Sequence, residues 1–121
     1  MSIQSYRDLD VWNVAMDLAA SCYKATREFP REEMFGLTSQ IRRAASSIPA
    51  NIAEGYGRNS TREFLRHLSI ARGSLMELET HVLLALRVNR MEPPDSRPLL
   101  ELAERVSRML FNLKISLEKR L

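Results

Sequence analysis

Apolar side chains recur at intervals of three and four residues in four separate stretches of this sequence. An α-helix has about 3.6 residues per turn, so this spacing places the apolar groups of each stretch on one helical face. No stretch alternates apolar and polar residues as a half-buried strand does. The chain has 121 residues but only four glycines and five prolines, so few residues interrupt the helices. The pattern predicts a protein built of long helices alone.

Two of the expected helices lie in the first half of the chain. The first covers about residues 9–28, with Asp8 or Asp10 as its N-cap, and it ends before Pro30. The second covers about residues 37–56, and the glycines of the GYG sequence at its end suit a C-cap. Both therefore have a start and a stop in the sequence.

The other two expected helices fill the second half of the chain. The third starts with a capping box, in which Ser60 accepts from the backbone of Glu63 while the Glu63 side chain reaches back. Its apolar rhythm continues to residue 88 or 89. The fourth helix starts after a proline-rich turn, with Asp95 or Ser96 as its cap.

Four amphipathic helices joined by short loops are typical of an antiparallel up-down-up-down four-helix bundle. We expect a single all-α domain over residues 1–121, since a chain of this length can bury one core. No apolar run approaches the roughly 20 residues that span a bilayer, and the N-terminus lacks the apolar region of a signal peptide. The one cysteine cannot form an internal disulfide. These features predict a cytoplasmic protein without a membrane segment.

The second expected helix has an unusual composition. Its sequence TSQIRRAASSIPANIAEGYGR consists largely of Ala, Ser and Arg, and it includes Pro49, which favours a kink. Small side chains allow another backbone to approach closely, and two interpretations stay open. These residues pack inside the monomer against the first helix, as we expect for Ala44, or they form a contact between subunits. The residues that we expect at an oligomer contact are Ala45, Ser46 and Ala53.

Positive charge is carried mainly by arginine, which supplies fifteen of the eighteen basic residues in a chain of net charge +3. Arginine suits bidentate contacts with phosphate. Few aromatic residues lie among the arginines of the second and third expected helices, so little stacking on bases is expected. We therefore expect recognition of the RNA or DNA backbone with little sequence preference. The alternative is an ordinary solvated helix face. The candidate nucleic-acid-binding residues are Arg42, Arg43, Arg58, Arg62 and Arg66.

Catalytic and metal-binding patterns are weak in this sequence. Glu63 and Glu77 each lie four residues before a histidine, His67 or His81, but the Glu-x-x-His motif of bundle metal sites does not occur. Cys22 lies on the apolar stripe of the first helix, where a cysteine usually packs as a small apolar group. The sequence therefore predicts no metal, no cofactor and no enzymatic activity.

Three stretches together resemble a known family: DLDVWNVAMDL, FGLTSQIRRAASSIPANIAEGYGR and TREFLRHLSIARGSLMELET. They closely resemble a bacterial family of small four-helix-bundle proteins, which includes proteins encoded within intervening sequences of 23S rRNA genes. The accessory variability determinant of diversity-generating retroelements is a more distant relative. The resemblance spans most of the chain and is weakest in the fourth helix.

The resemblance implies a homopentamer with a positively charged surface, a role in binding nucleic acid or a nucleic-acid enzyme, and no known reaction. We therefore expect a non-enzymatic oligomeric protein that binds nucleic acid through its arginines. The alternative is a scaffold that binds another protein, for example a reverse transcriptase. In that case the arginines pair with carboxylates.

Overall fold

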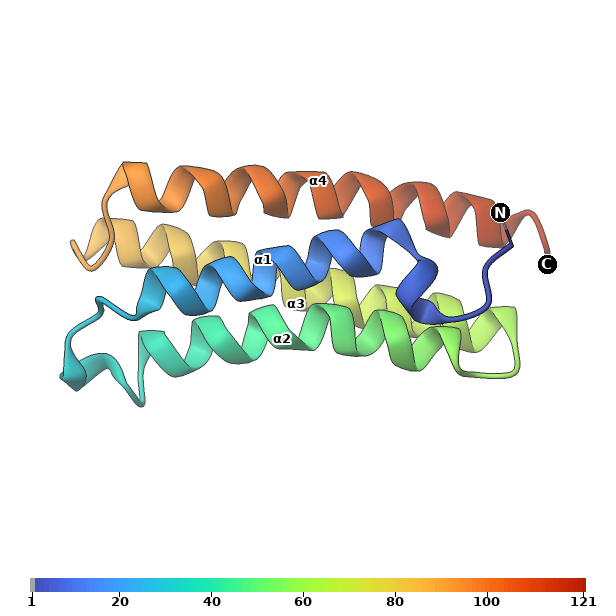
Figure 1. The fold of residues 1–121 in the computed structure, drawn as a ribbon, viewed down its shortest axis with the longest axis horizontal. Helices are drawn as coiled ribbons and strands as arrows, with labels where there is room; N and C mark the ends of the chain where they lie inside the picture. Colours follow the sequence, from blue (N-terminus) through green and yellow to red (C-terminus); the bar gives the residue numbers. More distant parts are fainter. Residues whose placement is uncertain (1) are drawn as a thin grey trace.

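Four long α-helices make up most of residues 2–121, which are the residues that the computed structural model describes. They are α1 (Asp10–Thr26), α2 (Leu37–Tyr56), α3 (Thr61–Arg87) and α4 (Pro93–Glu118). Two short 3₁₀-helices, η1 (Tyr6–Asp8) and η2 (Arg31–Glu33), precede α1 and α2, and no strand occurs within residues 2–121. Consecutive helices run in opposite directions (Figure 1). The expected all-α four-helix bundle is confirmed.

Each helix packs against two others, so that the bundle has the order α1, α2, α3, α4 around its axis. Within the described residues, the diagonal pairs α1–α3 and α2–α4 do not meet. Each apolar stripe turns inward, and the burial of these side chains is the main stabilising term. The largest side chains that are completely buried in the core are Leu18, Cys22, Ile41, Ile48, Ile52, Leu75, Leu78, Val82 and Val106.

The ends of α3 follow local sequence signals. Ser60 is the N-cap, and its hydroxyl accepts a hydrogen bond from the backbone nitrogen of Glu63 at 3.1 Å. The Glu63 carboxylate pairs with Arg66 instead of the N-cap backbone, so half of the expected capping box forms. The helix ends before Asn89, which has a φ of 60° and thus the left-handed conformation that often follows a helix.

The start of α1 differs from the prediction. Neither Asp8 nor Asp10 caps it, because Leu9 occupies the N-cap without a side-chain hydrogen bond. Asp8 serves η1 instead: its carboxylate accepts from the backbone nitrogens of Gln4 at 2.9 Å and Ser5 at 3.2 Å. The predicted cap of α1 is therefore wrong: Ser5 is the N-cap of η1, and Asp8 is the third residue of its capping box.

The start of α4 also differs. The helix begins at Pro93 and Pro94, before the predicted caps Asp95 and Ser96, which lie inside its first turns. Proline suits the first helical positions because it has no N–H group to leave unpaired and its φ is already helical. The two prolines therefore start the helix rather than precede it.

The second helix runs without interruption through Pro49, and Figure 1 shows no sharp break in it. Gly57 is its C-cap residue, in the right-handed conformation. Gly55 lies inside the helix and is buried. A Cβ atom at Gly55 would lie 2.7 Å from the Cβ of His67 and 3.0 Å from Cδ1 of Phe64, both on α3. Gly55 therefore permits a close approach of α2 to α3.

Ser47 of α2 takes part in this same contact. The hydroxyls of Ser47 and Ser74 lie 2.8 Å apart across the two helices, and Asn51 donates to the Ser47 carbonyl at 2.9 Å. Ala44 and Ala45 are buried in the core. The interior interpretation is right for Ala44 and Ala45. Ser47 meets α3, whereas other small residues of α2 lie beside Trp12 and Tyr23 of α1, as expected. Ala45 is fully buried, so its side chain is not available to another subunit.

Candidate nucleic-acid interface

Three of the five predicted arginines lie around the turn between α2 and α3. Arg58 Nη2 lies 2.8 Å from Glu54 Oε2, one helical turn away, and Arg66 Nη2 lies 3.3 Å from Glu63 Oε1. Arg62 is exposed and has no ion pair within residues 2–121. The structure brings the three together, but two of them are balanced by carboxylates of the same chain.

Both ion pairs are exposed at the protein surface. An exposed pair contributes only about 0–1 kcal/mol, because water and salt compete with it. A phosphate group can therefore replace either carboxylate at a small cost. The carboxylates nevertheless reduce the positive potential that would attract a polyanion from a distance.

One of these carboxylates, that of Glu54, lies beside a buried histidine of α3, His67. His67 Nδ1 lies 2.9 Å from the carbonyl oxygen of Glu63, so this nitrogen carries the proton and donates. Its Nε2 lies 3.4 Å from Glu54 Oε2. The hydrogen bond from Arg58 and, next, the coulombic effect of His67 lower the pKa of Glu54. Glu54 thus stays ionised and links the turn to the close contact between α2 and α3.

A fourth basic residue joins this region from the far end of the sequence. Arg120 and Arg58 line the same shallow hollow of about 270 Å³, together with Tyr56 and Asn59. Arg120 was not among the residues predicted from the sequence to bind nucleic acid. The signal was the Lys119–Arg120 pair, but only the bundle topology places the end of the chain beside the turn between α2 and α3.

The remaining two predicted arginines lie elsewhere. Arg42 is held inside the monomer: its Nε donates to Thr26 Oγ1 at 2.9 Å, its Nη2 donates to the Tyr23 carbonyl at 3.3 Å, and its guanidinium lies 4.7 Å from the Tyr23 ring centre. Arg42 is therefore half-buried, and its guanidinium is engaged by the C-terminal end of α1. Arg43 is exposed, but it lies about 22 Å from Arg58 along the helix axis.

Ser46 and Ala53, the two other residues predicted at an oligomer contact, lie on the face formed by α1 and α2. Ser46 is exposed and Ala53 is half-buried, and both line a shallow groove of about 430 Å³ between α1 and α2. Trp12, Met16 and Tyr23 line its α1 side. Among residues 2–121, no charged residue lines this groove, so it has the composition of a surface that packs against protein.

Neither catalysis nor metal binding has a clear candidate among the described residues. Within residues 2–121, no three side chains of His, Cys, Asp or Glu gather as metal ligands do. Burial raises the pKa of the Cys22 thiol to about 12, so the thiol is protonated and unreactive at neutral pH. None of the helices described combines the length and the apolar character that a bilayer crossing requires.

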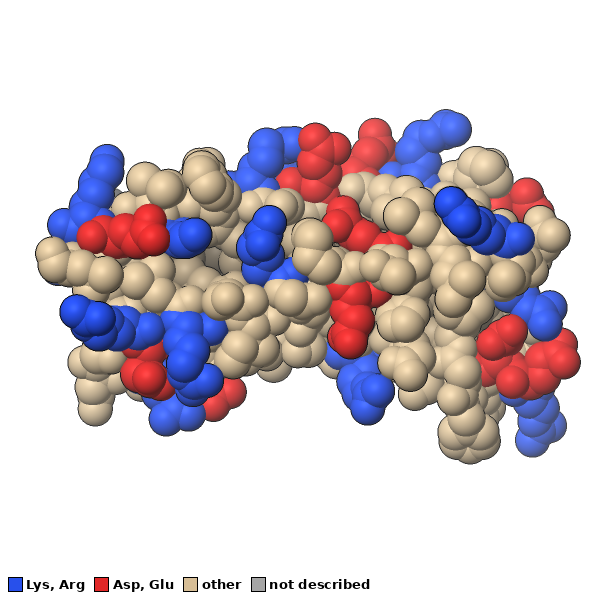
Figure 2. All heavy atoms as spheres, turned by 180° about the vertical axis from the view of Figure 1, so that it is seen from behind, with Lys and Arg blue, Asp and Glu red and all other residues tan. Residues whose placement is uncertain are grey.

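Charges of both signs share the surface. Figure 2 shows the face opposite to that of Figure 1, where basic and acidic side chains are interspersed with uncharged surface. This face carries no broad field of one sign. On this face, electrostatic attraction of a polyanion would therefore come from local groups of basic residues.

Two comparisons with known proteins bear on the fold and the family. The family model described as 23S rRNA-intervening sequence protein matches residues 7–112. A similar solved structure is that of a protein of unknown function from the S23 ribosomal protein family of Bacteroides thetaiotaomicron. It is 22% identical with a TM-score of 0.77, and the match covers 86% of this chain and 97% of that chain, which shows a shared fold. Among curated proteins, none matches this chain.

Proposed function

Because the chain belongs to the family of 23S rRNA-intervening sequence proteins, we propose that it is a non-enzymatic oligomeric protein that binds the backbone of RNA or DNA. The observation that carries this proposal is the position of Arg58 and Arg120 in one hollow, with the exposed Arg62 nearby. Arg66 adds a further guanidinium on α3. These residues act by contacting phosphates, in the cytoplasm, without reading base sequence.

Assembly strengthens such binding. Each subunit offers only a few phosphate contacts, and two of the arginines are partly neutralised. In a homopentamer, the arrangement that the family resemblance implies, the same contacts repeat five times and act together. The groove between α1 and α2, with Ser46 and Ala53, is the proposed subunit contact.

Binding of mixed-sequence RNA and DNA, measured by fluorescence anisotropy across a salt series, tests the proposal. We expect saturable binding at low salt that weakens steeply as salt rises, because phosphate contacts release counterions. Replacing Arg58, Arg62 and Arg66 by alanine should remove most of the binding and flatten the salt slope.

A matched control separates a local site from net charge. Arg87, Arg97 and Arg105 are also exposed, and replacing them by alanine removes the same charge away from the turn between α2 and α3. The proposal requires the control to keep most of the affinity. Equal losses in the two triple variants would leave only nonspecific charge attraction, and no binding at low salt would reject the proposal.

A protein-interaction scaffold, for example for a reverse transcriptase, is the second candidate. The uncharged groove between α1 and α2 and the pairing of Arg58 and Arg66 with carboxylates favour it. Sedimentation of the pure protein against the 13.9 kDa monomer mass, with Ala53→Arg as a variant, tests whether this groove joins subunits. If the original protein and the Ala53→Arg variant are both monomeric and nucleic acid does not bind, the groove would be assigned to the binding of a different protein.

A further inference from the structure

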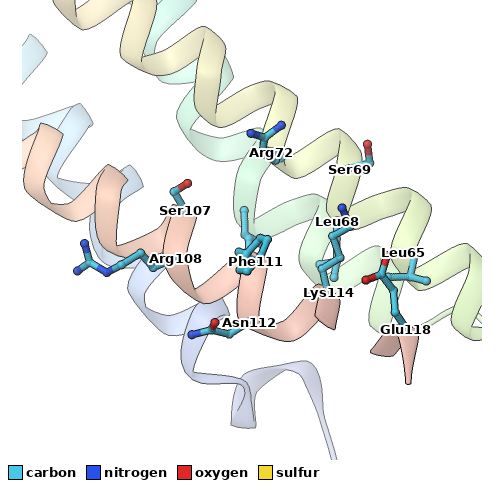
Figure 3. Close-up of a pocket in the computed structure, with 11 residues that line it drawn as sticks. Leu65, Leu68, Ser69, Arg72, Ser107, Arg108, Phe111, Asn112, Lys114 and Glu118 are labelled. Carbon is cyan, nitrogen blue, oxygen red and sulfur yellow. The ribbon is translucent and has the colours of Figure 1, made fainter. Parts of the chain in front are cut away.

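A second, larger groove lies between α3 and α4, on a different face from the groove between α1 and α2. Its volume is about 730 Å³, within the range of roughly 300–1,000 Å³ that is typical of small-molecule sites. Its lining extends over residues 107–118 of α4, which is about 16 Å of helix. Figure 3 shows its lining residues on the two neighbouring helices.

The floor of this groove is apolar. Leu65 and Leu68 of α3 and Leu110 and Phe111 of α4 form it. Phe111 is 60% exposed, although it lies between the two helices, as Figure 3 shows. A ligand that covers this ring and its leucine neighbours gains about 25 cal/mol for each Å² of apolar surface removed from water.

Two cations without an ion pair within residues 2–121 stand above this floor. Arg72 comes from α3 and Lys114 from α4, so they approach the groove from opposite sides. Arg108 is also at the groove, but it is paired with Glu104 at 2.8 Å. A single anion placed in the groove can therefore meet a positive charge from each helix.

Charge is also distributed unevenly along the groove. Figure 3 shows Arg108 at one end of the groove, Glu118 with Leu65 at the other end, and Arg72 and Lys114 between them. The Glu118 carboxylate repels an anion at its own end. A bound ligand would thus place its anionic group near Arg72 and its apolar part over Phe111 and Leu65.

We propose that the groove between α3 and α4 binds a small amphipathic anion, with an acidic head group at Arg72 and Lys114 and an apolar body on the leucines and Phe111. The limited volume and length of the groove favour a small molecule over a partner helix. The apolar floor gives no advantage to a nucleic-acid backbone, so this site is independent of the arginines at the turn between α2 and α3.

Sodium decanoate is a suitable probe, since it combines a carboxylate with an apolar chain. Titration of the full chain, followed by NMR of its methyl groups, should give saturable binding. The methyl resonances of Leu65, Leu68 and Leu110 should shift. Methyl resonances at the other groove, near Ser46 and Ala53, should stay unchanged. Decanol should bind at least about tenfold more weakly, because it lacks the charge that Arg72 and Lys114 meet.

Two variants locate the site. Arg72→Gln with Lys114→Gln should weaken decanoate binding about tenfold or more while leaving decanol unaffected. Ser69→Trp should fill the groove and abolish binding of both, and all three side chains are exposed, so the fold should persist. Thr80→Trp, which adds the same side chain at an exposed position of α3 outside both grooves, is the matched control and should bind decanoate normally.

Several results would overturn the inference. One is an absence of saturable decanoate binding, and another is equal affinity for decanoate and decanol. Methyl shifts in the groove that follow protein concentration alone would show that a second copy of the chain covers it. Binding of an acidic amphipathic peptide without decanoate would assign the groove to a protein partner.

Discussion

The contact between α2 and α3 and the contact between α3 and α4 join the same long helix to its two neighbours, yet only the first is tightly closed. At the first contact the facing residues are small: Gly55, Ser47 and Ser74 let the helices meet, with the two hydroxyls 2.8 Å apart. At the second, Leu65 and Phe111 face a groove of about 730 Å³. The size of the facing side chains sets how closely two helices approach, and it decides which contact leaves room for a ligand.

Gly55→Ala should have the largest effect on this difference. The added Cβ would lie 2.7 Å from the Cβ of His67, so α2 and α3 would have to separate. Overpacking of this kind costs about 1–3 kcal/mol, and we expect a loss near the upper end in urea unfolding. Unchanged stability would show that the two helices move apart freely and that the close contact is not essential.

Ser74→Ala should have a smaller effect at the same contact. It removes one partner of the hydrogen bond between Ser47 and Ser74, which is worth about 1 kcal/mol. The double variant Ser47→Ala with Ser74→Ala should recover part of the loss, because no hydroxyl is then left without its partner. A double-mutant cycle measures the coupling, and independent effects of the two changes would argue against a hydrogen bond across the helices.

Gly73→Ala is the matched counterpart of Gly55→Ala and should have the opposite sign. Gly73 is exposed in α3, and a Cβ there would meet no atom within 4 Å. Alanine restricts the unfolded chain more than glycine does, so the free energy of unfolding should rise by about 0.5–1 kcal/mol. A decrease would mean that the surroundings of Gly73 are more crowded than the structure shows.

The change of stability with pH should also distinguish the two contacts. These are the smallest effects that we expect. At the first contact, Arg58 and then His67 lower the pKa of Glu54, so its ionised form stabilises the fold. This stability is present above the unfolded pKa and is lost as pH falls through the lower folded value. At the second contact, burial and the nearby Glu104 raise the pKa of Glu79, so its ionised form destabilises the fold until acid protonates it.

Urea unfolding between pH 3 and pH 7 can measure how Glu54 and Glu79 each change the free energy of unfolding. Glu54→Gln should lower stability at neutral pH, and the difference should disappear only below about pH 4. Glu79→Gln should raise stability at neutral pH, and its difference should disappear at a higher pH than that of Glu54→Gln. The same sign of effect for the two variants would contradict this assignment.

Much of the fold could be predicted because it depends on local patterns. The bounds of α2, the Ser60 cap and the burial of Cys22 all follow from residues within a few positions in the chain. The start of α4 was misplaced because two prolines can either break a helix or begin one. Local rules do not distinguish these outcomes without the packing of the following turn.

The candidate site was less predictable, because an arginine is free or bound according to what lies opposite. Arg42 and Arg43 are adjacent in sequence, yet Arg42 donates to groups at the end of α1 while Arg43 is exposed. Arg120 was overlooked because Arg58, which lies beside it in the folded protein, is distant in the sequence. Helical periodicity shows which face a residue occupies, but it does not show which other element covers that face.

By itself, the sequence determined the class of fold, the number of helices and the faces that turn inward, since these follow from the 3.6-residue period and local caps. Tertiary structure alone decided that Gly55 meets His67, that Ala45 is fully enclosed, and that a groove opens between α3 and α4. Such features depend on the distance between helices. That distance is set jointly by side chains from separate parts of the chain, and no single stretch of sequence contains it.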